Sequence, residues 1–219
     1  NVVNNVSGAF GAFRRSFLQK IGGWDTHTAE DLDITLRIKN YFGRRPLRIP
    51  FEPRAIGHTD APVTFRQFLM QRLRWDGDLF FLYVRKHRHS FTPRLLGWPN
   101  FLVVLVSGFF FQLVLPFIIL GYFIVGLYSL TLSTFLVLAW LVYLVYLANT
   151  LLAYVVAVCM VSERPRQDLW LCWVVPLFPL FMFVMRCWSA VAILNEMIRR
   201  GHEETSMAPW WVLRKAKRF

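Results

Sequence analysis

The hydrophobic and polar positions of this chain are separated into long blocks. Residues 1–96 mix short apolar groups with charged side chains, whereas the 65 residues 97–161 contain no Lys, Arg, Asp, Glu or His. A run of that length far exceeds the ~20 apolar residues that cross a bilayer. The pattern therefore predicts a polar domain at 1–96, membrane helices at 97–195 and a basic, Trp-containing tail at 196–219.

The start of the polar domain has the alternation of a strand. Residues 7–13 alternate small and aromatic side chains, and a short helical pattern follows at Phe17, Leu18 and Ile21. The glycine pair at 22–23 then predicts a tight turn. The sequence therefore predicts a strand, a helix and a turn in this order.

Two further helices and two short strands are predicted before the apolar block. Residues 28–43 predict a helix ended by a glycine, and residues 62–87 predict a long amphipathic helix. Between them, segments 47–51 and 54–59 are bounded by prolines and predict strands. This mixture of strands and helices predicts an α/β fold for the polar domain.

The apolar block predicts two membrane-spanning helices, at 101–127 and 135–161. A third apolar stretch, 169–194, contains prolines and an arginine, and is predicted either as a further span or as a broken, re-entrant or interfacial segment. The basic loop 162–168 belongs on the cytoplasmic side with the polar domain by the positive-inside rule. Tryptophans in the basic tail favour a membrane surface on that side as well.

Charge and the first residue add three hypotheses. The formal net charge is +12, and 16 of the 25 Lys and Arg lie within residues 1–96. Such a charge attracts anionic lipid, so a non-enzymatic, basic, membrane-anchored binding protein is one hypothesis. A small transporter or channel built from the apolar half is another. Because the chain begins with Asn1 and its polar part is short, we also expect a fragment that lacks an N-terminal half.

Glu30 and Asp31 are candidates for acid–base chemistry. Both stand at the start of a predicted helix, where a positioned carboxylate can remove a proton from a sugar hydroxyl. The alternative is an ordinary helix start, because Thr28 followed by acidic residues is typical of helix capping.

Gln71, Arg74 and Trp75 are candidates for substrate binding. They lie one helical turn apart, so we expect all three to face one cleft. Arginine can hold a diphosphate through two hydrogen bonds, and a tryptophan face can stack on a sugar ring. The alternative is that Trp75 anchors the chain at the membrane surface while the arginines contact lipid headgroups.

The order of the segments resembles a known enzyme family. SGAFGAFRR, GGWD, AEDLDITLR and TDAPVTFRQFLMQRLRW, followed by apolar spans, resemble the second half of membrane-embedded family 2 glycosyltransferases. These include the processive synthases of poly-N-acetylglucosamine, cellulose, chitin and hyaluronan. The resemblance implies an α/β fold, the C-terminal part of a GT-A-like cytoplasmic glycosyltransferase domain, followed by an all-α transmembrane region.

The resemblance also implies an activity. It is an inverting transfer of a sugar from a nucleotide-diphosphate sugar to a growing polysaccharide, at the cytoplasmic face of the plasma (inner) membrane and coupled to translocation. A non-processive transferase that glycosylates a lipid-linked acceptor would share the same motifs. The partners implied are the donor, the acceptor, membrane lipid and an accessory subunit, and no nucleic acid.

The family's TED motif supplies the catalytic base and corresponds here to residues 29–31. The resemblance therefore gives Asp31 this role, with Glu30 beside it. The QxxRW motif falls on 71–75, so Gln71, Arg74 and Trp75 would contact the donor diphosphate and the acceptor, while Ser7 and Gly8 correspond to the acceptor-side wall. A divalent metal, Mg or Mn, is expected for the intact enzyme, with ligands in a DxD motif that is not in this chain.

Overall fold

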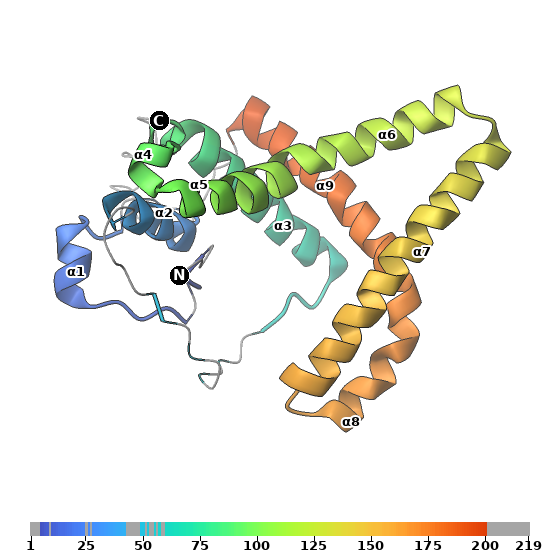
Figure 1. The fold of residues 1–219 in the computed structure, drawn as a ribbon, viewed down its shortest axis with the longest axis horizontal. Helices are drawn as coiled ribbons and strands as arrows, with labels where there is room; N and C mark the ends of the chain where they lie inside the picture. Colours follow the sequence, from blue (N-terminus) through green and yellow to red (C-terminus); the bar gives the residue numbers. More distant parts are fainter. Residues whose placement is uncertain are drawn as a thin grey trace. The chain divides into compact units, whose positions relative to one another are not determined.

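The computed structural model describes residues 5–8, 10–24, 26, 28–42, 49–50, 52, 55, 57 and 60–200. These residues form helices joined by turns and irregular segments (Figure 1). The chain divides into two compact units. The first comprises Asn1–Pro116 and Ser189–Phe219, and the second comprises Phe117–Trp188.

The predicted α/β fold class is wrong for the part of the chain that the structure describes, since none of those residues lies in a strand. At residues 7–13 the chain turns back on itself: a Cβ on Gly11 would lie 2.7 Å from the carbonyl oxygen of Ser7. The small residues that suggested a strand thus make a close backbone approach instead. Most of the two strands predicted at 47–51 and 54–59 lies outside the described residues.

The first unit begins with α1 (Arg15–Lys20) and α2 (Glu30–Phe42), both at predicted positions. Gly22 and Gly23 form the turn after α1, with φ angles of 84° and 67° that favour glycine. In Figure 1, α2 (blue) lies next to the short helix α4. Four apolar side chains of α2 are almost fully buried, so α2 is the central helix of this unit. They are Leu32, Ile34, Leu36 and Ile38.

The long helix predicted at 62–87 is present as α3 (Phe65–Phe80), which continues as the π-helical segment η1 (Phe81–Lys86). It starts with a capping box. The amide of Gln67 donates to Thr64 Oγ1, and the amide of Thr64 donates to Gln67 Oε1, each over 3.2 Å. The box satisfies two amide groups that otherwise lack partners at the helix start, and so fixes where α3 begins.

Short helical segments lead from η1 into the first apolar helix. Tyr83 of η1 is buried and packs edge-to-face on Phe91, with ring centroids 5.2 Å apart. Its hydroxyl end approaches the backbone of Gly108 in η3 so closely that only glycine fits there. The segments between η1 and α6 (Leu115–Ser129) are η2 (Arg88–Ser90), α4 (Pro93–Leu96), α5 (Trp98–Val103) and η3 (Val104–Val114).

Within the part of the chain that the structure describes, three helical stretches are long and apolar enough to cross a membrane. They are Trp98–Ser129 with 32 residues, Leu132–Val161 with 30 and Pro165–Arg199 with 35. The first two correspond to the spans predicted at 101–127 and 135–161. Proteins whose backbone polar groups are all satisfied within helices suit the apolar interior of a bilayer.

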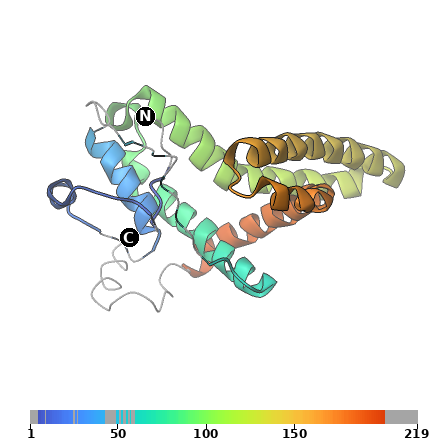
Figure 2. The ribbon, with the colours of Figure 1, turned by 90° about the horizontal axis from the view of Figure 1, so that it is seen from below.

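The proline-containing stretch stays helical. It consists of α8 (Pro165–Asp168), the 3-10 segment η5 (Leu169–Leu177) and α9 (Phe178–Arg199), and it belongs to the second unit as far as Trp188. Helix α7 (Leu132–Val156) lies beside η5 in both Figures 1 and 2. The hydroxyl of Tyr143 donates to the carbonyl of Pro176 over 3.0 Å, which satisfies one backbone group within the tighter 3-10 segment.

Gly108→Ala should lower the thermal unfolding midpoint of the detergent-solubilised protein. The added Cβ would lie 2.6 Å from the Tyr83 hydroxyl oxygen and 2.8 Å from its Cζ, so a buried ring must move. Such overpacking costs about 1–3 kcal/mol. Gly121→Ala is the matched control, because nothing lies within 4 Å of its Cβ position. Equal midpoints for the two variants would contradict this packing.

Candidate functional site

Glu30 and Asp31 lie in the first turn of α2, where the helix dipole favours acidic side chains. Glu30 is exposed and Asp31 is half-buried. The Asp31 carboxylate accepts hydrogen bonds from Asn5 Nδ2 at 2.9 Å and from the amide of Leu32 at 2.7 Å. Both carboxylate oxygens are thereby held in place at the helix start.

Gly8, which follows Ser7, lies against this acidic pair. A Cβ on Gly8 would stand 3.2 Å from Asp31 Cβ and 3.4 Å from Glu30 Oε1. The loop is attached to α2 by the amide of Val6, which donates to Thr35 Oγ1 over 3.0 Å. The structure thus places Gly8 next to Glu30 and Asp31.

The turn that precedes α2 is strained and anchored. Ala29 has φ of 44°, in the left-handed region that residues with a side chain seldom adopt, at a cost of about 1 kcal/mol or more. Thr28 is buried, and its hydroxyl donates to Asp78 Oδ2 in the last turn of α3. The predicted role of Thr28 as an ordinary helix cap is therefore replaced by a long-range bond.

Gln71 and Arg74 line a cavity of about 890 Å³ beside α3. Trp75 is not among its lining residues: its ring lies under the Arg72 guanidinium, 4.9 Å from centroid to Cζ, and is 45% exposed. The structure thus places two of the three motif residues on the cavity wall and the third on an adjacent face of the helix. The remaining lining residues are Asp60, Ala61, Pro62, Thr64, Arg66, Gln67, Met70, Leu73, Gly77, Asp78, Asn195 and Glu196.

Asp33 forms a buried ionic cluster that the motif analysis missed. Its Oδ1 lies 2.9 Å from Lys86 Nζ and 2.7 Å from His87 Nε2, and its Oδ2 lies 2.9 Å from Arg37 Nε. Burial alone raises the pKa of Asp33, but the hydrogen bond from His87 and the charges of Lys86 and Arg37 outweigh burial and lower the pKa to about 2. The basic run at 85–88, at the end of a predicted helix, was the available sequence signal.

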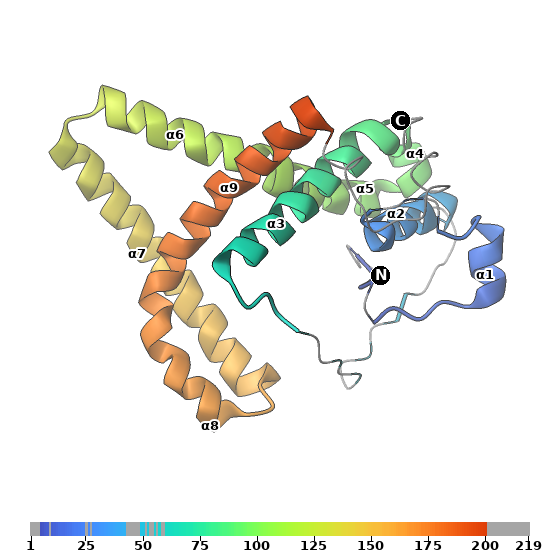
Figure 3. The ribbon, with the colours of Figure 1, turned by 180° about the vertical axis from the view of Figure 1, so that it is seen from behind.

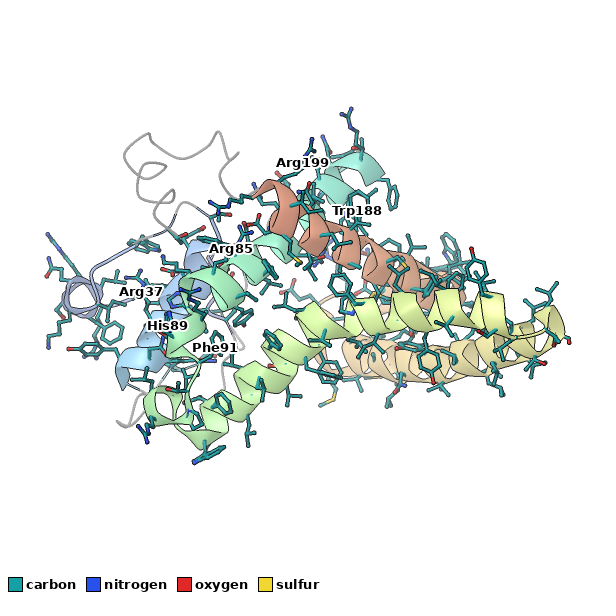
Figure 4. The ribbon with its side chains drawn as sticks, turned by 90° about the horizontal axis from the view of Figure 1, so that it is seen from above. Arg37, Arg85, His89, Phe91, Trp188 and Arg199 are labelled. Atoms are coloured by element: carbon teal, nitrogen blue, oxygen red, sulfur yellow. The ribbon has the colours of Figure 1, made fainter. Side chains whose placement is uncertain are left out.

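Arg37 extends this cluster to the glycine turn. Its Nη1 donates to the carbonyl of Ile21 over 2.9 Å, and its Nη2 donates to the carbonyl of Gly23. Figure 4 labels Arg37 on α2. The GGWD turn, α2 and η1 are therefore held to one another through a single buried carboxylate and its cations.

The sequence Asp76-Gly77-Asp78, which suggested no role by itself, joins α3 to the C-terminal part of α9. Ser189 Oγ donates to Asp76 Oδ2 over 2.7 Å. A Cβ on Gly77 would lie 3.4 Å from Glu196 Cβ and 3.7 Å from the carbonyl oxygen of Ala192, so the helices touch at this glycine. Figures 1 and 3 show α3 and this part of α9 side by side.

Arg85 fixes the end of α9. Its Nη1 lies 3.0 Å from Glu196 Oε1, and its Nη2 donates to the carbonyls of Glu196 and Met197, each over 3.2 Å. Arg85 is labelled in Figure 4. Carbonyls in the last turn of a helix lack helical partners and carry partial negative charge, so a guanidinium stabilises them. Glu196 is 2% exposed, which makes this ion pair part of the core.

Asp78 has an electrostatic setting unlike that of Asp33. Burial raises the pKa of its carboxyl to about 7, assisted by Glu196 and Glu30 and opposed by the Thr28 hydrogen bond and the charge of Arg74. The carboxyl is 4% exposed and stands on the cavity wall. Near neutral pH it is close to the point of ionisation.

A metal centre is not built from the described residues. Among them, no group of three or more His, Cys, Asp or Glu side chains is arranged to hold a metal ion. No binding site for the divalent ion that the family resemblance implies is therefore assigned to the described residues.

Comparison with known proteins defines the class. A family model described as glycosyl transferase family group 2 matches residues 2–212, almost the whole chain. The molecule is therefore of the glycosyltransferase class. It belongs to glycosyl transferase family group 2.

Two relatives share a shorter region of 74 residues. The chain is 36% identical there to the protein named "Probable glycosyltransferase YdaM" of Bacillus subtilis. It is 32% identical to the poly-beta-1,6-N-acetyl-D-glucosamine synthase of Staphylococcus epidermidis. Each alignment covers 33% of this chain and 17% of the relative, so the chain matches a small part of each relative's length. No solved structure shows a significant match.

Acid should destabilise the protein through Asp33. Its pKa falls from 3.8 to about 2 on folding, so its contribution is complete above about pH 4 and is lost as the pH falls towards 2. The linkage amounts to about 2 kcal/mol. Thermal unfolding midpoints measured between pH 2 and pH 7 test this.

Asp33→Asn should also destabilise the protein at pH 7, because it removes the buried counter-ion of Lys86. The unfolding free energy should fall by about 3 kcal/mol, and the thermal unfolding midpoint should fall with it. Glu163→Gln, which removes an exposed carboxylate, is the control. Parallel pH curves for wild type and Asp33→Asn would contradict the ionic cluster.

Proposed function

We propose that this chain forms the acceptor side of an inverting glycosyltransferase, which moves a sugar from a nucleotide-diphosphate sugar to a growing polysaccharide. One observation carries the proposal. The acidic pair at the start of α2, with Gly8 against it, is tied through Thr28 to the helix that presents Gln71 and Arg74 to a cavity. Family membership and the similarity to a polysaccharide synthase support it.

Asp31 acts as the catalytic base in this proposal. Its carboxylate takes the proton from the acceptor hydroxyl, and the freed oxygen forms a bond to the anomeric carbon of the donor sugar. The bond from that carbon to the diphosphate breaks, and its electrons leave with the nucleoside diphosphate. The hydrogen bonds from Asn5 and from the amide of Leu32 keep the carboxylate oriented for this step.

Arg74 and Gln71 serve the leaving group. A guanidinium on the cavity wall stabilises the negative charge that develops on the diphosphate, and an amide beside it orients the phosphate oxygens. Trp75, on the adjacent exposed face, offers a ring for stacking on a sugar of the acceptor. In the intact enzyme a Mg or Mn ion would neutralise diphosphate charge, held by residues other than those described here.

The three apolar helices supply the membrane part of the proposal. They hold the transfer site at the cytoplasmic face of the plasma (inner) membrane and form part of a path for the polymer. Lipid, the nucleotide-sugar donor, the polysaccharide acceptor and an accessory subunit are the proposed partners. A lipid-linked acceptor with a single transfer is the alternative outcome, and product length distinguishes the two.

Asp31→Asn in the full-length protein should lower kcat by about 10²- to 10⁴-fold, because the general base is lost while the side-chain shape is kept. Sugar incorporation and nucleoside diphosphate release in membrane vesicles measure this. Glu163→Gln controls for expression and insertion. Near-normal transfer by Asp31→Asn would contradict the assignment of Asp31 as the catalytic base.

Arg74→Ala should lower kcat about 100-fold or more, whereas Arg72→Ala should change it less than about threefold. Of these two arginines, Arg74 lines the cavity, while Arg72 stacks on Phe68 and Trp75. Arg74→Lys should recover part of the rate, since it keeps the charge but not the paired donors. Equal losses at both arginines would indicate a general basic surface instead.

A further inference from the structure

Two motifs that lie far apart in the sequence are joined by one buried hydrogen bond. Thr28, before α2, and Asp78, in the last turn of α3, are separated by 50 residues, and both are 4% exposed. The hydroxyl of Thr28 donates to Asp78 Oδ2. Neither residue belongs to the motifs that suggested the transfer site.

The Thr28 end of this bond controls the start of α2. Thr28 is followed directly by Ala29, whose strained left-handed backbone accepts the first helical hydrogen bond of α2 from the amide of Asp33, over 2.9 Å. Asp31 stands within that first turn. A shift of Thr28 therefore moves the turn that carries the proposed base.

The Asp78 end of the bond belongs to the wall of the cavity. Asp78 follows Arg74 by four residues on α3, so the two stand one turn apart on the same face, and both line the cavity. The carboxylate that holds the Thr28 turn is thus on the same rigid helix face as the proposed diphosphate ligand. The separation of Asp31 and Arg74 depends on this contact.

Burial and the neighbouring acidic groups make an ionised Asp78 unfavourable for stability, so stability does not explain an acidic residue at this position. Charged groups face it from each element packed against it: Glu30 from α2, Arg74 from α3 and Glu196 from α9. Two of these three are acidic, and burial raises its pKa to about 7. Groups with such shifts gather at functional sites, where their place serves the reaction.

We propose that Asp78 is a positioning residue for sugar transfer, which sets the place of Asp31 relative to Arg74 by holding Thr28. This inference rests on the proposed function and gives Asp78 a role that acts through Thr28. Misplacement of reacting groups by about 1 Å costs roughly 100-fold in rate. Loss of the bond should therefore appear in kcat rather than in donor KM.

The test is a double-mutant cycle in the full-length protein in vesicles. Thr28→Val and Asp78→Ala should each lower kcat about 10- to 100-fold, with donor KM within about threefold of wild type. The double variant should be no slower than the slower single variant. Rates are normalised to folded protein, measured by size exclusion and thermal unfolding.

Conservative replacements separate positioning from packing. Thr28→Ser keeps the hydroxyl and Asp78→Asn keeps an acceptor oxygen, so both should retain kcat within about threefold of wild type. Asp76→Ala is the matched control. It removes a buried carboxylate two residues away that binds Ser189 instead, and should lower thermal stability with kcat of the folded protein kept within about threefold.

Three results would overturn the inference: additive losses in the cycle, an Asp78→Asn variant as slow as Asp78→Ala, or losses confined to donor KM. Asp31→Asn keeps this separate from the proposed function. If Asp31→Asn is active, the proposed function fails. If Asp31→Asn is inactive while Thr28→Val and Asp78→Ala have normal kcat, only the role of Asp78 fails.

Discussion

The first unit depends on the requirement that a buried charge be paired. Asp33 is completely buried, and an isolated carboxylate there would cost several kcal/mol. Lys86 and His87 meet one oxygen and Arg37 meets the other. Because these cations come from the end of η1 and from α2, the pairing fixes the central helix against the end of the α3–η1 helix. The residues of the candidate site on both helices are positioned by this pairing.

A second set of polar contacts links α3 and η1 to the last apolar helix. Ser189 and Glu196 are polar residues in a helical stretch that is long and apolar enough to cross a membrane. Each has a partner on the α3–η1 segment. Gly77 allows the backbones to approach between them. The end of α9 is thereby built into the same unit as the candidate site, so this helix does more than anchor the chain.

Sequence patterns were informative where local spacing decides the structure. The apolar periods at 28–43 and 62–87 identified α2 and α3, and the glycine pair identified the turn after α1. The strand prediction at 7–13 was wrong, because small and aromatic residues in a tight turn alternate with the same period as those of a strand. The contact of Gly8 with Glu30 and Asp31 joins two segments that stand apart in the motif order.

Such patterns did not predict which residues distant in sequence contact each other. Arg85 and Glu196 are 111 residues apart. Their polarity indicates that each needs a partner, but it does not indicate which residue that partner is.

The π-helical hydrogen bonding of η1 is a further reason why the sequence did not predict these contacts. It widens the turn, so the residues that follow are rotated away from the directions that an α-helical continuation of α3 would give them. Three adjacent basic residues therefore have different partners. Arg85 contacts Glu196 on α9, whereas Lys86 and His87 contact Asp33 on α2. The π-helical turn over six residues thus directs adjacent basic side chains to two different acids, Glu196 on α9 and Asp33 on α2.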